Sequence, residues 1–354
     1  MTNSIKKTCS RFIISSSLAC LVGLGLMSTI SVVYAANETT ELKFAITEGT
    51  KAARTIYGHQ KWADAVEKAS NGSLKISLFP SGSLVSPKQM YDATINGLAD
   101  ISCISIGHYP GRFPLTEALS FPGSGISNPQ KAAEVIMAMN KKYPQMQKEF
   151  NAIKPLFFFG FAPMSIATVE KPVRSWDDLK GMRLRINHKG SADYLKKAGV
   201  SPAFIAPPDI FLNLQKGIID GSVMGWFGHH AFGTTKLANY FTEVPSVPGP
   251  FFSYIMNKKK FESLTEEQKN AILSVSGENG AAMLAESGEM EIEVSTKSIK
   301  EDPKKEIIQL SAEEEEIWAQ KAVEAQEKLV KKLSKRGLPA QELIDDVKLM
   351  TKKD

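Results

Sequence analysis

The sequence predicts an α/β protein built from two similar units, and two observations support this. Strand and helix patterns alternate from residue 41 to residue 105, and a similar alternation starts again at residue 154. Alternating strands and helices favour parallel sheets covered by helices, and two such units favour a ligand cleft between them. A chain of 354 residues with 43% apolar content is also long enough to bury such cores.

The first unit is predicted from short alternating strands and from helices with one apolar face. Its strands are 41–45, 74–79 and 98–105, and its helices are 56–69, 87–96 and 128–139. A Pro-Ser-Gly-Ser turn at 80–83 separates the second strand from the second helix.

The second unit begins with the dense apolar strand 154–161. Further strands are predicted at 182–186 and 218–224, with helices at 191–198 and 209–215. A mostly helical run at 265–300, a strand at 306–310 and an amphipathic helix at 312–335 follow. The acidic run 313–316 lies in the first turn of that last helix, where carboxylates complement the helix dipole, so we interpret it as a solvated helix start rather than a metal site.

The N-terminus has the features of a secretory signal peptide. Residues 6–11 carry three basic side chains, an apolar stretch covers residues 12–33, and Val-Tyr-Ala ends at Ala35. This pattern predicts a signal peptide over residues 1–35, cleaved after Ala35, and export to the periplasm. The alternatives are an uncleaved membrane anchor and lipoprotein anchoring at Cys20, for which Ser17-Leu18-Ala19-Cys20 is a poor box.

Charge and cysteine content change once these residues are removed. The whole chain carries 43 basic and 38 acidic residues, but 40 basic residues remain against 38 acidic ones after residue 35. A nearly neutral chain gives no argument for a nucleic-acid partner. Cys103 is the one cysteine left, which excludes an intrachain disulfide, and its apolar setting predicts a buried small hydrophobe.

Motifs of enzyme chemistry are absent from the sequence. It contains no Gly-x-Ser-x-Gly elbow, Walker loop, dinucleotide fingerprint or His-Glu-x-x-His, and we expect no cofactor and no metal site. The alternative is an exported hydrolase or isomerase that uses His188, His229 or His230 with Asp209 or Asp220.

Several segments together resemble the DctP-like solute-binding proteins of tripartite ATP-independent periplasmic (TRAP) transporters. They are Phe-Pro-Ser-Gly-Ser-Leu at 79–84, Asn-Gly-Leu-Ala-Asp-Ile at 96–101, and the stretches 171–185, 195–199 and 214–221. Their order and spacing match the family over nearly the whole chain after residue 35.

The resemblance implies a two-lobed periplasmic-binding-protein-like fold with a ligand cleft between the lobes and a long helix spanning both. Because the chain of such proteins crosses between lobes more than once, lobe I is expected at 36–160 plus about 250–290. Lobe II is expected at 161–249 plus about 291–354. Hinge closure of the two lobes would bury the ligand.

The function implied by the resemblance is that of a receptor, not an enzyme. Such a protein captures a small organic acid anion, closes, and delivers it to a TRAP membrane permease driven by an ion gradient. We expect a monomer. A further alternative is a sensor that presents its closed form to a membrane kinase instead of a permease.

Arg185 is the first candidate for ligand binding. In the family, the arginine that ends the Leu-Lys-Gly-x-x-x-Arg motif holds the ligand carboxylate, and residues 179–185 match that motif. A planar guanidinium can donate two parallel hydrogen bonds to a carboxylate and stays charged when it is desolvated. Strand alternation places Arg183 on the same face, so position alone does not choose between the two arginines.

The turn after Arg185 offers second contacts. The helix expected at Ser191 begins close to this strand end, and its free backbone donors favour an anion there. Asn187 and His188 are therefore candidate ligand contacts, with a plain turn as the alternative interpretation.

Two departures from the family predict the kind of ligand. Where members that bind sialic acid or C4-dicarboxylates have Gln-Glu-Asn-Pro, this chain has Ser-Val-Met-Gly-Trp-Phe at 222–227, and residues 160–165 lack the second arginine of those members. The remaining candidate ligand contacts are apolar or aromatic: Phe161, Met164, Met224, Trp226 and Phe227. We therefore expect a monocarboxylate with an apolar or aromatic body, such as an aryl, branched-chain or 2-oxo acid.

Overall fold

The structure, a computed structural model, describes residues 39–161, 164–186 and 188–352. The predicted signal peptide, its cleavage after Ala35 and the alternative lipidation of Cys20 lie outside the described residues. Within the described ranges, no helix is both long enough and apolar enough to cross a membrane.

The first sheet combines early strands with one strand from much later in the chain. Its order is β2 (Leu74–Phe79), β1 (Thr40–Ala45), β3 (Ile101–Ser105), β10 (Phe251–Met256) and β4 (Lys154–Gly160). β1 pairs in parallel with both β2 and β3, as the strand and helix alternation predicted. β10 lies antiparallel between β3 and β4, so the chain returns to its first lobe.

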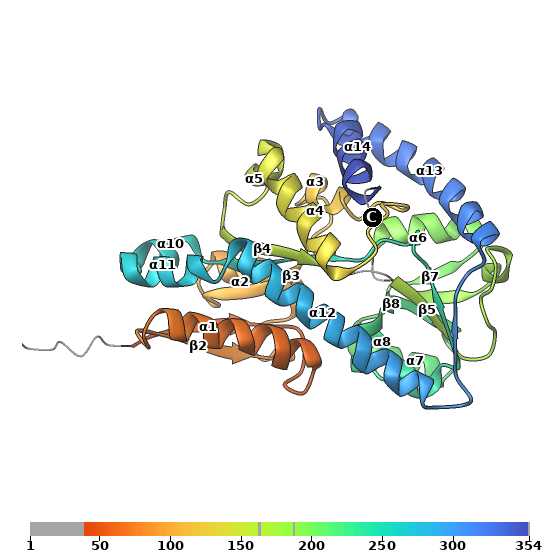
Figure 1. The fold of residues 1–354 in the computed structure, drawn as a ribbon, viewed down its shortest axis with the longest axis horizontal. Helices are drawn as coiled ribbons and strands as arrows, with labels where there is room; N and C mark the ends of the chain where they lie inside the picture. Colours follow the sequence, from red (N-terminus) through yellow and green to blue (C-terminus); the bar gives the residue numbers. More distant parts are fainter. Residues whose placement is uncertain (1–38, 162–163, 187, 353–354) are drawn as a thin grey trace, which may run out of the picture. The chain divides into compact units, whose positions relative to one another are not determined.

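The second sheet lies beside the first in the described part of the chain (Figure 1). Its order is β11 (Glu306–Ile308), β9 (Tyr240–Glu243), β5 (Met164–Thr168), β8 (Gly221–Gly225), β6 (Arg183–Arg185) and β7 (Ser201–Ala203). β6 runs parallel to β7 and β8, whereas β5 runs antiparallel to β8 and β9. The last of these strands in the chain, β11, pairs in parallel with β9.

Short helices connect the strands and cover the sheets. The helices before β5 are η1 (Thr55–Gln60), α1 (Lys61–Ala69), η2 (Pro87–Gln89), α2 (Met90–Ile95), η3 (Ile106–His108), α3 (Pro114–Ala118), α4 (Pro129–Lys142) and α5 (Pro144–Lys148). The later ones are η4 (Asp177–Leu179), α6 (Lys189–Leu195), η5 (Lys196–Ala198), η6 (Pro207–Asp209), α7 (Ile210–Gln215), α8 (Trp226–Ala231), α9 (Thr234–Leu237), α10 (Lys258–Ser263), α11 (Glu266–Ser274), α12 (Gly277–Lys300), α13 (Ala312–Ser334) and α14 (Ala340–Thr351).

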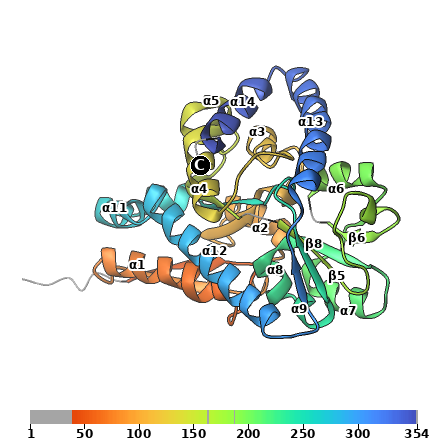
Figure 2. The same cartoon turned by 45° about the vertical axis from the view of Figure 1, so that its right-hand side comes forward.

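Two long helices span both lobes. α12 packs against α4 and β4 of the first lobe and, further along, against α8 and β11 of the second (Figures 1 and 2). α13 starts in the core of the second lobe, where Trp318 is buried, and reaches the core of the first lobe at Leu333. The fold is therefore two-lobed with a long helix across both lobes, as the resemblance implied.

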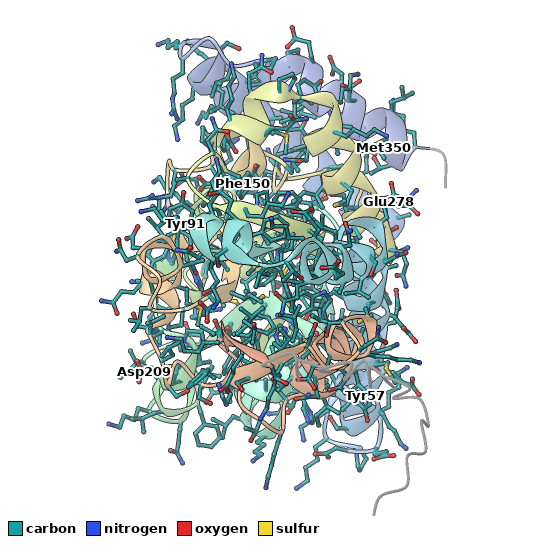
Figure 3. The ribbon with its side chains drawn as sticks, turned by 90° about the vertical axis from the view of Figure 1, so that its left-hand side faces the viewer. Tyr57, Tyr91, Phe150, Asp209, Glu278 and Met350 are labelled. Carbon is teal, nitrogen blue, oxygen red and sulfur yellow. The ribbon has the colours of Figure 1, made fainter. Side chains whose placement is uncertain are left out.

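Aromatic side chains fill the core of the first lobe. Phe113 and Phe150 stack with ring centroids 4.7 Å apart, and Phe157 stacks on Tyr254 at 4.3 Å. Figure 3 shows Phe150 among the packed side chains between the helices. Such offset and tilted aromatic pairs each add stability beyond their buried area.

Several elements differ from the sequence prediction. The helical run predicted at 265–300 is broken at Val275 and Ser276 into α11 and α12. The strand predicted at 218–224 is shorter at its start and covers Gly221–Gly225, and α8 begins at Trp226. The lobe boundaries remain a prediction, but α14 packs its apolar face, including Leu343 and Val347, into the core of the first lobe. That packing argues for moving 340–351 from lobe II to lobe I.

Candidate ligand-binding site

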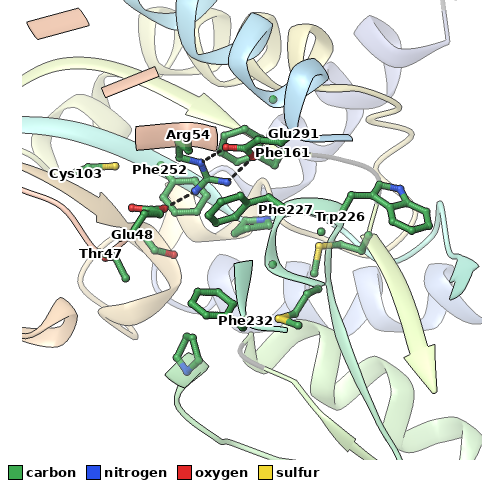
Figure 4. A pocket seen from close by; sticks show the side chains of 18 of the residues that line it. Thr47, Glu48, Arg54, Cys103, Phe161, Trp226, Phe227, Phe232, Phe252 and Glu291 are labelled. Atoms are coloured by element: carbon green, nitrogen blue, oxygen red, sulfur yellow. Dashed lines mark hydrogen bonds and ion pairs between the residues drawn. The ribbon is translucent and has the colours of Figure 1, made fainter. Parts of the chain in front are cut away.

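A pocket lies between the two sheets, with α12 as its back wall (Figure 4). Its internal volume is about 110 Å³. Six of the eight predicted contacts line it: Arg185, Phe161, Met164, Met224, Trp226 and Phe227. The lining also includes residues that the sequence did not indicate, namely Thr47, Glu48, Arg54, Ser105, His108, Phe252 and Glu291.

Arg185 stands at the end of β6 as a buried cation without a carboxylate partner. Its side chain is 2% exposed, and its Nε donates a hydrogen bond to the carbonyl oxygen of Ile205 at 3.1 Å. Within the described residues, neither terminal nitrogen has a hydrogen-bond partner and no acidic group forms an ion pair with this arginine. Burial alone lowers its pKa to about 10, so the guanidinium remains charged at neutral pH.

Arg183, two residues earlier, lies outside the pocket. Its guanidinium is half-exposed and is paired with Asp220, with Nε 3.1 Å from Oδ2. This ion pair raises the pKa of Arg183 and lowers that of Asp220. The two arginines that strand position alone could not separate therefore have different environments, and Arg185 is the one that faces the pocket.

A second arginine in the pocket is neutralised by two carboxylates. Arg54 Nη1 donates to Glu48 Oε1 at 2.8 Å, and Arg54 Nε and Nη2 donate to the two oxygens of Glu291 at 3.0 and 3.1 Å. All three side chains are buried, and Figure 4 shows the guanidinium between the two acids. Glu48 also approaches His59, whose Nε2 lies 3.4 Å from Oε2.

The two acids of this network have opposite pKa shifts. Burial raises the pKa of Glu48, but Arg54 and a hydrogen bond with His59 overcome that effect and bring it to about 2. For Glu291, burial outweighs the attraction of Arg54, and the pKa rises to about 7. Glu291 is therefore the group of this network that titrates near neutral pH.

Aromatic rings enclose Arg54 from both lobes. Its guanidinium carbon lies 3.9 Å from the ring centroid of Phe161, 4.3 Å from that of Phe227 and 5.1 Å from that of Phe252. Phe227 belongs to α8 of the second lobe, whereas Arg54 precedes η1 of the first. The arrangement forms a flat apolar wall with a cation–π contact between the lobes.

Trp226 differs from its expected role. Its ring is 1% exposed, and it stacks on Phe241 at 6.1 Å in a separate cluster of the second lobe. Figure 4 shows the ring turned away from Arg54, while Phe227 reaches toward it. The start of a helix at Trp226 explains this, because neighbouring helical side chains diverge by about 100°.

Of the two candidates in the turn after Arg185, His188 is the one that the structure describes, and it does not line this pocket. Asn187 lies outside the described residues. His188 is the N-cap of α6, where Nδ1 accepts a hydrogen bond from the backbone N–H of Ser191 at 3.3 Å. It lines a second cavity instead, and burial lowers its pKa to about 4.

The histidines and acids of the enzyme alternative do not form a catalytic arrangement within the described ranges. His229 is buried with Nε2 3.3 Å from the carbonyl oxygen of Ser165, and His230 is exposed. Among the described residues, none of the three histidines forms a hydrogen bond or an ion pair with Asp209 or Asp220. No group of three or more His, Cys, Asp or Glu residues that could hold a metal occurs in the described part either.

Sequence reasoning missed Glu48, Arg54 and Glu291, because no motif marks Glu48 and Arg54, and Glu291 lies far from both in the chain. Arg54 and Glu291 are separated by 237 positions and meet only because α12 crosses both lobes. One signal was present in the sequence: Glu291 lies seven positions after Leu284 in the predicted helical run, so the acid falls on the same helical face as an apolar residue. In the structure its side chain is 2% exposed.

Comparison with known proteins identifies the family. The model of the bacterial extracellular solute-binding proteins, family 7 (DctP), matches residues 48–333. The monocarboxylate 2-oxoacid-binding periplasmic protein of Nostoc sp. is 27% identical over 250 residues, which cover 67% of this chain and 66% of that protein. This alignment therefore spans slightly less than two thirds of the relative's length.

Solved structures agree with that match. A TRAP solute-binding protein from a marine metagenome, specific for aromatic acid ligands and solved with metahydroxyphenylacetate, is 26% identical, covers 89% of this chain and 99% of its own, and has a TM-score of 0.81. A TRAP solute-binding protein from Rhodoferax ferrireducens, solved with benzoate, shares the fold at 23% identity over 89% of this chain and 98% of its own, with a TM-score of 0.83. The chain belongs to family 7 of the bacterial extracellular solute-binding proteins, the TRAP-type receptors for organic acid anions.

Proposed function

We propose that this protein binds a monocarboxylate with an aromatic or other apolar body, and that Arg185 holds the carboxylate. The observation that carries the proposal is the state of Arg185, a buried guanidinium with two free terminal nitrogens facing a pocket. A buried cation without a counter-ion is costly, and a ligand carboxylate supplies both the missing charge and the missing acceptors.

The remainder of the pocket favours an apolar body. Phe161, Phe227 and Phe252 present rings to it, and Met164 and Met224 add polarisable apolar surface. The marine relative, which is specific for aromatic acids, supports the same ligand class for this chain.

A dicarboxylate is a poorer fit because, among the described residues, the pocket has only one guanidinium with unused donors, that of Arg185. Arg54 already donates to Glu48 and Glu291, so a second ligand carboxylate there would have to displace a buried ion pair. Breaking such a pair is strongly unfavourable, by about 3–5 kcal/mol when one partner is left unpaired.

The physiological role follows from the family. Relatives are named as periplasmic binding proteins, and TRAP receptors deliver their ligand to a membrane permease. We infer that this protein is exported by its N-terminal signal, acts as a monomer, closes its lobes on the anion and presents the closed form to the permease.

The test is a comparison of two arginine variants. Native mass spectrometry first identifies the retained anion, and calorimetry then measures its binding to the wild type, Arg185→Ala and Arg183→Ala. Loss of a charge-assisted hydrogen-bonded pair costs about 1.5–3 kcal/mol, so Arg185→Ala is expected to bind at least roughly tenfold more weakly.

Arg183→Ala is the matched control because it removes the same charge from the same strand outside the pocket. It is expected to bind as tightly as the wild type. Unchanged binding by Arg185→Ala, or equal losses in both variants, would contradict the carboxylate clamp. Conversion of the retained anion to another compound would instead indicate an enzyme.

A further inference from the structure

A second, larger cavity lies on the other side of the contact between the lobes, backed by α13. Its internal volume is about 420 Å³, compared with about 110 Å³ for the ligand pocket. Its walls come from three segments: residues 111–122 of the first lobe, residues 188–197 around α6 of the second lobe, and residues 325–336 of α13 and the turn after it. We call this cavity the basic vestibule.

α13 supplies the vestibule with an apolar stripe beside a basic one. Ala325, Leu329 and Leu333 recur every four residues and continue into the core, while Lys328 and Lys332 recur on the adjacent stripe. Phe121, fully buried, extends the apolar floor from the first lobe. An apolar floor with a cationic rim fits an anion that has an apolar body.

The charge of the rim is only partly neutralised. Five cationic residues and two carboxylates line the vestibule. Lys189 lies 3.5 Å from Asp193, and Lys197 lies 2.7 Å from Glu324. Within the described ranges, Lys328, Lys332 and Arg336 have no carboxylate within ion-pair distance, and all three are exposed. Three cations therefore remain available to an anion.

A narrow gap lies between the vestibule and the ligand pocket. A small cavity of about 10 Å³, room for about one water molecule, shares Ser105 and His108 with the ligand pocket and Ser120 and His188 with the vestibule. Passage of an organic anion through it requires the lobes to separate.

His188 gives this dividing wall an unused hydrogen-bond donor. Because Nδ1 accepts from the backbone N–H of Ser191, the proton of the neutral ring is on Nε2. That nitrogen is buried and has no partner among the described residues. The Nε2–H group of His188 is therefore a donor without an acceptor among the described residues, and it lies where the vestibule meets the gap.

We propose that the basic vestibule is a second, weak site for the same class of anion, which holds the carboxylate beside the cleft before it reaches Arg185. The identity of the anion rests on the proposed function, but the site itself rests on the vestibule's own residues. Clefts lined by one sign of charge concentrate oppositely charged ligands and raise association rates, by tenfold to a thousandfold in strong cases.

The first experiment detects the site directly, with benzoate as the probe. Backbone amide shifts of ¹⁵N-labelled Arg185→Ala protein are followed by NMR while benzoate is added. Saturable shifts are expected at residues 188–190 and 328–333, with a dissociation constant of roughly millimolar size, because exposed charges contribute little each. They are expected to be lost in the triple variant Arg185→Ala/Lys328→Gln/Lys332→Gln.

The matched control replaces two other exposed lysines of one helix, Lys258 and Lys259 of α10, which do not line the vestibule. Arg185→Ala/Lys258→Gln/Lys259→Gln is expected to keep the vestibule shifts. Absence of saturable shifts at the vestibule in the Arg185→Ala protein, or equal loss in both lysine variants, overturns the proposal.

A kinetic experiment on protein with intact Arg185 measures the consequence. The association rate of benzoate is expected to fall several-fold in Lys328→Gln/Lys332→Gln at about 20 mM salt and to match the wild type at about 0.5 M, where the charges are screened. The dissociation rate is expected to stay unchanged.

The two proposals fail in different ways. Vestibule shifts without any effect of benzoate on residues around Arg185 in the wild type would contradict the proposed ligand class and support the vestibule. The opposite result would be tight binding that depends on Arg185, without vestibule shifts and with the same association rate in Lys328→Gln/Lys332→Gln as in the wild type. It would support the proposed function and contradict the vestibule.

Discussion

Phe227 and Arg54 meet across the ligand pocket, with the guanidinium carbon of Arg54 4.3 Å from the centroid of the Phe227 ring. Arg54 is fixed in the first lobe by Glu48 and by Glu291 of the spanning helix. Phe227 belongs to α8 of the second lobe. The contact therefore joins the two lobes, and we expect it to stabilise their closed arrangement.

Replacing Phe227 by Ala is expected to speed up ligand release. A cation–π contact contributes about 0.5–2 kcal/mol, so its loss is expected to raise the dissociation rate roughly two- to thirtyfold. Stopped-flow displacement of the bound anion measures this rate. The association rate is expected to change less, because the contact forms after the anion has entered.

Phe204 provides the control for that experiment. Its ring is 65% exposed and does not line the pocket, so Phe204→Ala removes the same side chain without touching Arg54. A dissociation rate that is the same in Phe227→Ala and the wild type, or raised equally in Phe204→Ala, would contradict the role of Phe227 in closure.

Glu291 is expected to make the folded state less stable as the pH rises from 5 to 8. Its pKa is about 7 in the folded protein and about 4.5 in the unfolded chain, so between these values the folded state binds more protons. The free energy of unfolding therefore falls through this range, by up to roughly 3 kcal/mol from this one group.

Denaturant unfolding of the wild type and of Glu291→Gln at several pH values tests this. Glu291→Gln cannot titrate, so its free energy of unfolding is expected to vary less between pH 5 and 8. Glu48 does not contribute in this range, because its pKa of about 2 confines its loss of stabilisation to acid pH. Parallel pH profiles for the two proteins would assign the titration to another group.

Several strands and helices of the first lobe could be predicted because the hydrophobic pattern of each lies within one continuous segment of the sequence. Alternation in 41–45 and 74–79 predicted β1 and β2, which pair in parallel as expected. β10 could not be placed in the same way, because its neighbours β3 and β4 lie far back in the chain. Its position between them follows from long-range pairing, which periodicity does not encode.

The candidate site was also predicted only in part from the sequence. The motif ending at Arg185 and the apolar residues around 161 and 224 were predicted and line the pocket. The Arg54 network was not, because an ion pair between residues 237 positions apart leaves no local pattern. Trp226 and Phe227 were both predicted as ligand contacts, and the helix that begins there sends only Phe227 toward Arg54.

Gly288→Ala is expected to disturb both stability and binding. A Cβ at this position would lie 2.7 Å from the Phe161 ring and 2.9 Å from Pro129, closer than carbon atoms approach without a shift. Overpacking of this kind costs about 1–3 kcal/mol, which exceeds the gain of about 1 kcal/mol in helix propensity. Because Phe161 lines the pocket, we expect ligand affinity to fall as well.

Gly280 separates the two effects. A Cβ there would lie 2.7 Å from Phe157, a core ring that does not line the pocket. Gly280→Ala is therefore expected to lower the thermal midpoint in the same way but to leave the affinity unchanged. If both variants lost affinity equally, the effect of Gly288 on binding would come from general destabilisation rather than from Phe161.

His108 is expected to tighten anion binding as the pH falls below neutral and the ring becomes protonated. Burial, then Arg185 and Lys88, lower its pKa, while Glu48 raises it, so the ring is neutral at pH 7. A bound carboxylate near Arg185 favours the protonated ring, and by linkage protonation favours the carboxylate. We expect the affinity measured by calorimetry to rise as the pH falls.

Glu291 titrates near neutral pH, so Glu291→Gln is measured beside His108→Gln. A pH dependence that survives in His108→Gln and disappears in Glu291→Gln would contradict the role of His108.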